Sequence, residues 1–298
     1  MLVTDGAGAG AAVTDVLDMT GGTSNVGLGS GSLGTAITTG TENTAIGADS
    51  LDAVTTGAYN VAVGKDALTD QTTGNYNVAV GRRAGYDITT GSENIAIGYL
   101  SLYAATTASN NVAVGTSALQ ANTSGTDNVA VGDRAGTAIT TGSDNTVVGD
   151  SAATGLTTGS FNTAIGSGAL ITQTTAGYNT AVGYLSLTAN TTGNANVGLG
   201  ESTLAANTTG SNNTALGYNV LAANTTASNN TAVGRNALDA NTTGADNTAV
   251  GRMALSANTT ASENTAVGQG SLEANTTGAD NTAVGHAALG SNTTASNN

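Results

Sequence analysis

The sequence predicts an all-β protein, a parallel β-solenoid (β-roll or β-helix) with one coil for every 17 residues. The first observation is a repeated phrase, which begins at Asn230 as NTAVGRNALDANTTGAD and returns with small changes from Asn247 and from Asn264. The second is its fixed spacing, because steps of 17 residues from Asn281 back to Asn43 meet an Asn every time, with a Gly four residues later. Such fixed self-similarity is typical of solenoids, in which each unit buries its apolar face against its neighbours.

The composition is the third observation, and it indicates a narrow core. The chain of 298 residues has 43 Gly, no Pro and one Phe, and its apolar residues are mostly Ala, Val, Ile and Leu, which suit a narrow bore. A net charge of −14 with only six Lys and Arg disfavours binding to nucleic acid or anionic membranes. The absence of Cys excludes disulfides and thiolate metal sites, and no apolar run reaches the about 18 residues of a membrane span.

The repeat divides the chain into two regions. Residues 1–24 do not fit it and are predicted to be an N-terminal linker or cap. Residues 25–298 are predicted to form the solenoid of sixteen units, the first of which carries one extra residue in the turn Gly34-Thr35-Ala36. A solenoid normally ends in an atypical capping unit, whereas the last unit here keeps the regular pattern. We therefore expect the solenoid to continue beyond residue 298 or to meet a partner there.

We number the positions of a unit from 0, the recurring Asn, to 16. Positions 1 and 3 hold Val, Ile, Leu or Thr, and alternation with period 2 sends both to one face of a strand, which we expect to be the core. Position 8, mostly Leu, and position 11, aliphatic in several early units, are also expected to point inward. Charged residues gather directly after the Gly of position 4 and at position 16, as corner residues would. The pattern predicts two or three short parallel strands per coil.

Position 2 would then lie on the outer face of the strand, and it is Ala in all but a few units. A solvated position would vary more, so a small, neutral face along the whole rod favours close packing against another rod. The alternative is a plain preference for small residues in a tight coil. We expect a homotrimer of three parallel chains in register, with end-to-end stacking as the alternative. The predicted packing face includes Ala45, Ala62, Ala79, Ala113, Ala232, Ala249 and Ala266.

Asparagine recurs at two positions, and both are expected to form ladders. In the later units position 11 is Asn followed by Thr-Thr, which also matches the acceptor sequence for N-glycosylation. If position 11 points inward, sugar has no access, and Asn side chains about 4.8 Å apart bond to one another from coil to coil. The Asn of position 0 is expected to form a second ladder that satisfies backbone groups at a corner. The first ladder comprises Asn190, Asn207, Asn224, Asn241, Asn258 and Asn275.

Aromatic residues gather at the corners, where they are candidate ligand contacts. Tyr59 and Tyr76 occupy the same position in adjacent units, as do Phe161 and Tyr178. Rigid surface aromatics suit sugar or protein ligands, because they offer a large contact area at a small entropic cost. The alternative is that these rings cover the backbone of the corner.

No residue pattern indicates catalysis, a metal or a cofactor. His286 is the single histidine, and no Ser or carboxylate recurs with it as a catalytic triad would require. Asp and Glu lie at corners without a coil-by-coil ligand spacing, and neither a calcium-binding nonapeptide nor a phosphate-binding loop is present. We therefore expect a protein that is not an enzyme and takes no cofactor.

The units Asn-Val-Ala-Val-Gly at residues 60, 77, 111 and 128 resemble the head repeats of trimeric autotransporter adhesins. The longer pattern NTAVG-xx-AL-x-ANTTG is similar to repeats in bacteriophage tail-fibre proteins. The resemblance covers residues 25–298, although the period of 17 is longer than that of the adhesin head. It implies a trimeric parallel β-roll or β-helix that serves in attachment.

The functional hypothesis is a structural fibre shaft or head of an attachment protein, extracellular on a virion (phage tail fibre) or on a cell surface (adhesin). Its partners would be copies of itself and a host-surface glycan or protein. A self-assembling extracellular filament is the first alternative. An ice-binding solenoid is the second, because the Thr column at position 12 is expected to face outward, with the adjacent Thr pointing the other way.

Overall fold

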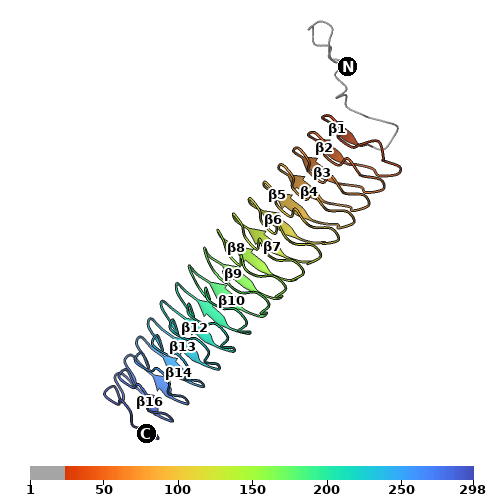
Figure 1. Cartoon of the computed structure of the whole chain (residues 1–298). Helices are drawn as coiled ribbons and strands as arrows, with labels where there is room; N and C mark the ends of the chain where they lie inside the picture. Colours follow the sequence, from red (N-terminus) through yellow and green to blue (C-terminus); the bar gives the residue numbers. More distant parts are fainter. Residues whose placement is uncertain (1–23) are drawn as a thin grey trace, which may run out of the picture.

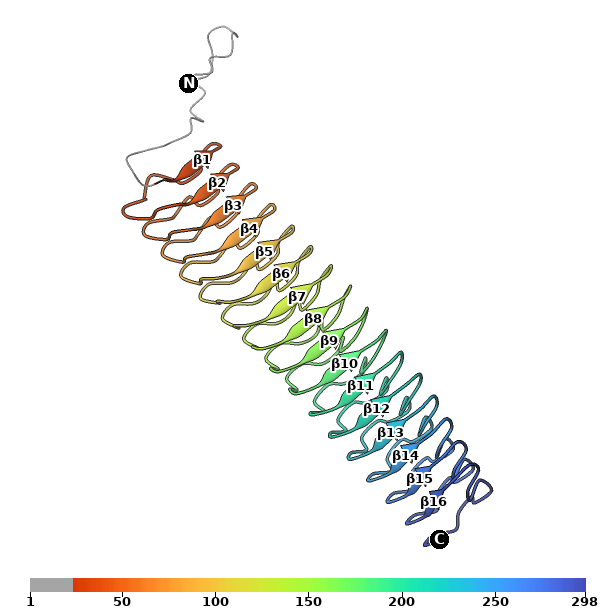
Figure 2. The ribbon, with the colours of Figure 1, turned by 180° about the vertical axis from the view of Figure 1, so that it is seen from behind.

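The computed structural model describes residues 24–298 and confirms the predicted all-β parallel solenoid. Sixteen strands form one sheet in the order of the sequence, and Figures 1 and 2 show them stacked in a single file along a rod. Residues 24–298 contain no helix, and so none that could cross a membrane. The predicted N-terminal linker or cap lies outside the described residues except for Ser24. The strands are β1 (Val26–Leu28), β2 (Thr44–Ile46), β3 (Val61–Val63), β4 (Val78–Val80), β5 (Ile95–Ile97), β6 (Val112–Val114), β7 (Val129–Val131), β8 (Thr146–Val148), β9 (Thr163–Ile165), β10 (Thr180–Val182), β11 (Val197–Leu199), β12 (Thr214–Leu216), β13 (Thr231–Val233), β14 (Thr248–Val250), β15 (Thr265–Val267) and β16 (Thr282–Val284).

The register between coils is constant. From β2 onward each strand residue pairs in parallel with the residue 17 positions later. Between β1 and β2 the step is 18, since Val26 pairs with Thr44. The extra residue lies between Leu33 and Thr38, because the N–H groups of both residues keep their regular partners in the next coil. The turn around Gly34 therefore absorbs the extra residue, as the sequence predicts.

Each unit contains one strand of three residues, so the prediction of two or three strands per coil is wrong. The reason is the backbone at positions 6, 8 and 16, which has positive φ in every described unit, for example 58° at Asn236, 51° at Leu238 and 58° at Asp246. Residues in this left-handed region cannot continue a strand. The turns still bond from coil to coil, as the N–H of Leu238 donates to the carbonyl of Ala254 at 3.0 Å.

Position 2 points into the core while positions 1 and 3 point outward, which is the reverse of the sequence-based expectation. The alanines of the predicted packing face are fully buried within their own chain, with 0% of each exposed. They are Ala45, Ala62, Ala79, Ala113, Ala232, Ala249 and Ala266. The cause is the narrow bore: a Cβ added at Gly27, which holds position 2 in the first unit, would lie 2.9 Å from the Leu33 side chain. The alternative interpretation, a preference for small residues in a tight coil, is therefore correct.

In several units a change of size at one core position is offset at another. Positions 8 and 11 point inward as predicted, and their Leu, Ile and Val side chains are among the fully buried ones. Where position 2 is the larger Val147, position 8 shrinks from Leu to Ala153, and both side chains remain buried. Where position 8 is Gly85, the side chain of Ile88 at position 11 fills the space, with its Cδ1 3.0 Å from the site of an added Cβ. Exchanges that conserve volume are those a close-packed core tolerates best.

Both predicted Asn ladders are present, and their side chains are buried. At position 0, Oδ1 of Asn230 accepts the backbone N–H of Asn247 at 2.9 Å, and Nδ2 of Asn230 donates to the carbonyl of Gly244 at 2.9 Å. At position 11, Nδ2 of Asn207 donates to Oδ1 of Asn190 at 2.9 Å. The same contact continues through Asn224, Asn241, Asn258 and Asn275. The folded coil therefore has no room for a glycan at position 11.

The position-0 ladder gives a stability prediction. Replacing Asn230 by Ala should lower the free energy of unfolding by about 2 kcal/mol or more, because the buried N–H of Asn247 loses its acceptor. Urea unfolding measures the change. The control is Asn229→Gly, which removes an exposed side chain at φ 63° and should cost less than about 1 kcal/mol, since Gly adopts this conformation readily. Equal losses in the two variants would contradict the proposed role of the ladder.

Candidate functional site

The outward side of the sheet is an uncovered apolar surface. It consists of positions 1 and 3 of the sixteen strands, and we call it the open face. Every exposed large aliphatic side chain among residues 24–298, apart from Leu289, lies on this face. These side chains are Leu28, Ile46, Val80, Ile95, Ile97, Val131, Ile165, Leu199, Leu216, Val250, Val267 and Val284. A continuous apolar strip thus runs from one end of the described rod to the other.

The open face changes in character along the rod. In β3 to β7, from Val61 to Val131, position 1 is Val or Ile, so both outward columns are aliphatic. In β8 to β16 position 1 is Thr except at Val197, while position 3 stays aliphatic. The face is therefore most apolar over β3 to β7, and it presents one hydroxyl column and one aliphatic column over most of the remaining length.

Two columns of corner residues border the open face. The leading edge consists of the residue directly before each recurring Asn, and the trailing edge consists of positions 5 and 6, directly after the strand and its Gly. The leading edge carries seven acidic residues and no basic residue: Glu42, Glu93, Asp127, Asp144, Asp246, Glu263 and Asp280. The trailing edge carries all six basic residues, Lys65, Arg82, Arg83, Arg134, Arg235 and Arg252, together with Asp49, Asp66, Asp133, Asp150 and Glu201. The charges on one border are thus all negative, and those on the other are mixed.

The candidate ligand residues are exposed on the leading edge, where they stack in pairs. The ring centroids of Tyr59 and Tyr76 lie 4.9 Å apart with an interplanar angle of 3°, and those of Phe161 and Tyr178 lie 5.1 Å apart. One face of each ring is therefore covered by its neighbour, and only the remaining face and the ring edges are free for a ligand. With 66% of its surface exposed, Tyr178 extends furthest into solvent of the four. Their role as ligand contacts stays a prediction.

Aromatic and guanidinium groups also meet on the trailing edge, which the sequence analysis did not foresee. The guanidinium carbon of Arg82 lies 5.8 Å from the ring centroid of Tyr99, and that of Arg235 lies 5.8 Å from the ring centroid of Tyr218. Such contacts are electrostatically favourable. Each pair occupies position 5 in consecutive units, so the repeat itself carried the signal that could have revealed it.

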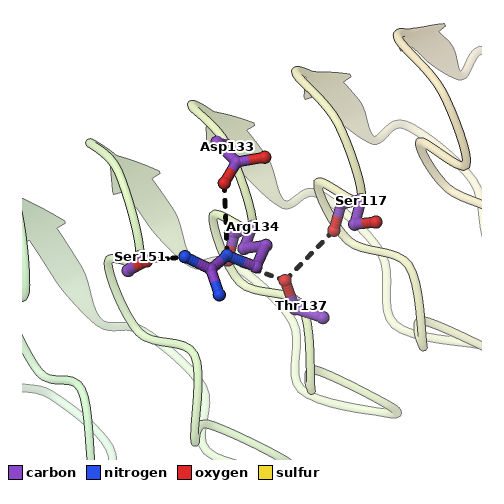
Figure 3. Close-up of polar contacts among 5 residues, drawn as sticks. All are labelled: Ser117, Asp133, Arg134, Thr137 and Ser151. Carbon is purple, nitrogen blue, oxygen red and sulfur yellow. Dashed lines mark hydrogen bonds and ion pairs between the residues drawn. The ribbon is translucent and has the colours of Figure 1, made fainter.

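Polar side chains link neighbouring units at the same edge (Figure 3). The guanidinium of Arg134 donates to Asp133 at 3.2 Å within its own unit and to the hydroxyl of Ser151 in the next unit at 3.2 Å. The hydroxyl of Thr137 lies 3.1 Å from the carbonyl oxygen of Ser117 and 2.7 Å from that of Arg134. The side chains of Arg134 and Asp133 remain 59% and 49% exposed. An ion pair this exposed contributes little stability, and its guanidinium stays accessible to other partners.

Thr recurs at positions 12 and 13 and forms two adjacent columns on a turn outside the strand. The position-12 hydroxyls donate to the carbonyl of the same position in the next coil, as that of Thr242 does to Thr259 at 2.9 Å. The neighbouring position 13 is exposed, as at Thr243, so the expectation that this Thr points inward is wrong. The bend at positions 12 and 13 explains the difference, since adjacent residues point to opposite sides only in an extended strand.

The titratable side chains are the groups from which a reactive or metal-binding site would be built. Residues 24–298 contain no group of three His, Asp or Glu side chains placed to hold a metal ion. His286 lies exposed on the trailing edge. Burial, and then the charge of Asp70, raise the pKa of Asp87, while the charge of Asp70 is the main cause of a raised pKa at Tyr86. Both shifts thus combine burial with the charge of an acidic residue in the adjacent coil.

No protein-family model, no curated protein and no solved structure matches this chain. A functional conclusion therefore depends on the open face, its two edges and the regularity of the rod.

Three consecutive units place Asp246, Glu263 and Asp280 side by side on the leading edge. A hydrogen bond with the Asp280 side chain, and then the charge of Asp280, raise the pKa of Glu263 above its ordinary value of 4.5. Because the pKa is raised in the folded state, protonation favours the fold at low pH, and this contribution is lost as the pH rises through the folded pKa.

The raised pKa of Glu263 can be measured by an NMR titration of its carboxyl carbon. Replacing Asp280 by Asn removes the neighbouring charge and should lower the pKa of Glu263 toward or below its ordinary value. The matched control replaces Glu273, at position 9 of the turn, by Gln. This change should leave the pKa of Glu263 as it is in the natural chain. A pKa that is the same in all three proteins would contradict the coupling.

Proposed function

We propose that this chain is a structural shaft or head segment of an extracellular attachment fibre, and that it works as an assembly of its own copies. The observation that carries the proposal is a rod of uniform coils with an apolar face left uncovered from end to end. The repeat gives no unit a distinct reactive centre, so the useful property of the molecule is its length and shape. We therefore propose a non-enzymatic role.

The bonding between coils supports a mechanical role. Neighbouring coils are joined by strand pairing, by hydrogen bonds between turns and by the two Asn ladders. Bending the rod at any coil would break several of these contacts at once, which makes the rod stiff. Sixteen coils at about 4.8 Å each give a length of roughly 75 Å. Such a rod can hold a binding element at a set distance from its base, on a virion or on a cell.

The dimensions of the open face support self-association. A length of about 75 Å and a strand width of about 10 Å give about 750 Å² per copy. Two such faces together bury about 1,500 Å², which is within the roughly 1,200–2,000 Å² of specific, stable interfaces. Three parallel rods whose open faces turn toward a common axis would shield all three faces from water. A homotrimer is therefore the assembly we propose, with end-to-end stacking into a filament as the alternative.

Ice binding is the competing function, because regular Thr columns lie at the exposed position 13 and, half-buried for the most part, at position 1 of the open face. Two observations weigh against it. The second outward column of the open face is aliphatic throughout, and the position-12 hydroxyls already donate to backbone carbonyls. Thermal hysteresis measured on the purified protein distinguishes the two functions, since a fibre shaft should show none.

The proposed association is tested by charges on the open face. Replacing Val80 and Ile97 by Glu should reduce the mass in sedimentation equilibrium to the 28.5 kDa of one chain, with an unchanged far-UV circular dichroism spectrum. The matched surface control is Thr107→Glu, on the exposed turn, which should keep the assembly. Ala79→Glu places a charge in the core and should unfold the coil instead. A wild-type chain that is monomeric at every concentration would overturn the association.

A further inference from the structure

We propose that the leading edge of one copy contacts the trailing edge of the next, and that this pairing holds the copies parallel in a closed ring, where they are in register. The pairing rests on the proposed association through the open face. It goes further, because it names the charged and aromatic side chains that meet between copies and the single relative orientation that they allow.

The geometry of the sheet decides which edges meet. In every coil the leading-edge residue precedes the strand and the trailing-edge residues follow it, so the two edges lie at opposite ends of each strand. When two open faces meet with parallel rod axes, their strands run in opposite directions, and each leading edge lies against a trailing edge. A cyclic trimer has the same relation between neighbours. When the axes are antiparallel, the strands run in the same direction and each edge lies against its own kind.

Charge distinguishes these two arrangements. Antiparallel packing sets the seven acidic residues of one leading edge opposite the seven of another, with no basic residue between them. Like charges across an interface disfavour a complex and so reject the wrong arrangement. Parallel packing instead sets the acidic residues opposite the edge that carries all six Lys and Arg. The open face itself is apolar and does not discriminate between parallel and antiparallel copies. The charges on its two borders therefore determine the orientation.

A closed ring of parallel copies also sets them in register, because a constant axial shift between neighbours would not close. Asp246 borders the start of β14 and Arg252 borders its end, so the two residues meet between copies at the same level. Arg235 lies one coil before Arg252, and Glu263 lies one coil after Asp246, within the about 4.8 Å rise of a coil. The long Arg side chains span that distance. Two guanidinium groups thus face two carboxylates across each such contact.

The aromatic residues of the two edges are matched in the same register. Tyr76 borders the start of β4 and Arg82 its end, which places a guanidinium beside an exposed ring between copies. Tyr178 and Tyr184 border β10 in the same way, and both are exposed. Tyr and Arg are residue types enriched at protein interfaces. The free ring faces of the leading edge thereby gain a partner.

The edges repel at three coils, the first of which is that of β2, bordered by Glu42 and Asp49. Asp127 and Asp133 border β7, and Asp144 and Asp150 border β8, so acidic residues meet acidic residues there. Arg134 is the one basic residue at this level, and it bonds to Asp133. Replacing Asp150 by Arg should therefore tighten the association at least several-fold at low salt, as measured by sedimentation equilibrium. Weaker association of this variant would contradict the edge pairing.

A charge exchange tests the pairing directly. Arg235→Glu with Arg252→Glu should weaken the association at least tenfold at low salt, and Asp246→Arg with Glu263→Arg should do the same. All four substitutions in one chain should restore it, because the contacts between copies return with exchanged signs. Thr243→Arg, at the exposed position 13 and outside both edges, is the control and should have little effect. Sedimentation equilibrium at several salt concentrations gives each dissociation constant.

Cysteine pairs test the orientation, because the natural chain has no Cys. Asn110 and Thr116 border the start and end of β6, about 20 Å apart within one chain. A chain with Asn110→Cys and Thr116→Cys should form disulfides between copies on oxidation if the copies are parallel and in register. The matched control is Asn110→Cys with Ala195→Cys. Both of these residues are on the leading edge, where they border β6 and β11, and they meet only if the copies are antiparallel.

The outcomes separate this inference from the proposed function. Disulfides between copies in the first cysteine variant and restoration by the four-residue exchange would support the pairing. The pairing would be overturned if the disulfides formed in the control variant instead, or if the charge exchange did not change the dissociation constant. Either result would leave the association through the open face intact. A wild-type chain that never associates would overturn both, and the Val80 and Ile97 variant would then have the same mass as the wild type.

Discussion

The structure depends on the Asn at position 0. Its side chain accepts the backbone N–H of the next recurring Asn and donates to the carbonyl of position 14 in its own unit, as Asn230 does with Asn247 and Gly244. These bonds satisfy buried backbone groups at a corner where no strand can do so. Both partners must recur at the same spacing for every coil, which explains why the period of 17 residues is so strict. An extra residue is accommodated only in the turn around Gly34, away from the ladder.

The narrow bore links the core to the outer surface. Position 2 has room for Ala or Gly, and a larger residue such as Val147 occurs where position 8 becomes smaller. The β-branched side chains of positions 1 and 3, which favour a strand, therefore stand on the outer side. A solenoid of this width exposes its most apolar strand residues by construction. Association with another surface is the way to remove them from water, and the regularity of the strip favours a partner with the same repeat.

The period, the solenoid class, the inward Leu column and both Asn ladders could be predicted from the sequence, because each depends on one residue type at one spacing. The side of the strand that points into the core could not be predicted. Alternation shows that positions 1 and 3 share a face, but the usual rule that the larger residues point inward fails in a bore too narrow for them. The single strand per coil was also hidden, since Leu238 at φ 51° gives no sign in the sequence of a left-handed backbone. The aromatic corners were evident, whereas the contact between Arg235 and Tyr218 was not predicted, although both residues hold position 5 in consecutive units.

Variation along the rod is greatest at positions that the coil does not need. Positions 0, 2, 4 and 8 are constrained by the ladder, the bore, the corner and the core, so differences between units gather at positions 5, 6, 9 and 16. The units before Asn179 vary most at these corners, and those after it are nearly identical. The first half also has the more apolar open face, over β3 to β7, and three of the six basic residues within two consecutive units, at Lys65, Arg82 and Arg83. The first half of the rod is therefore the more varied and the more apolar part, whereas the more uniform second half presents a Thr column beside an aliphatic column.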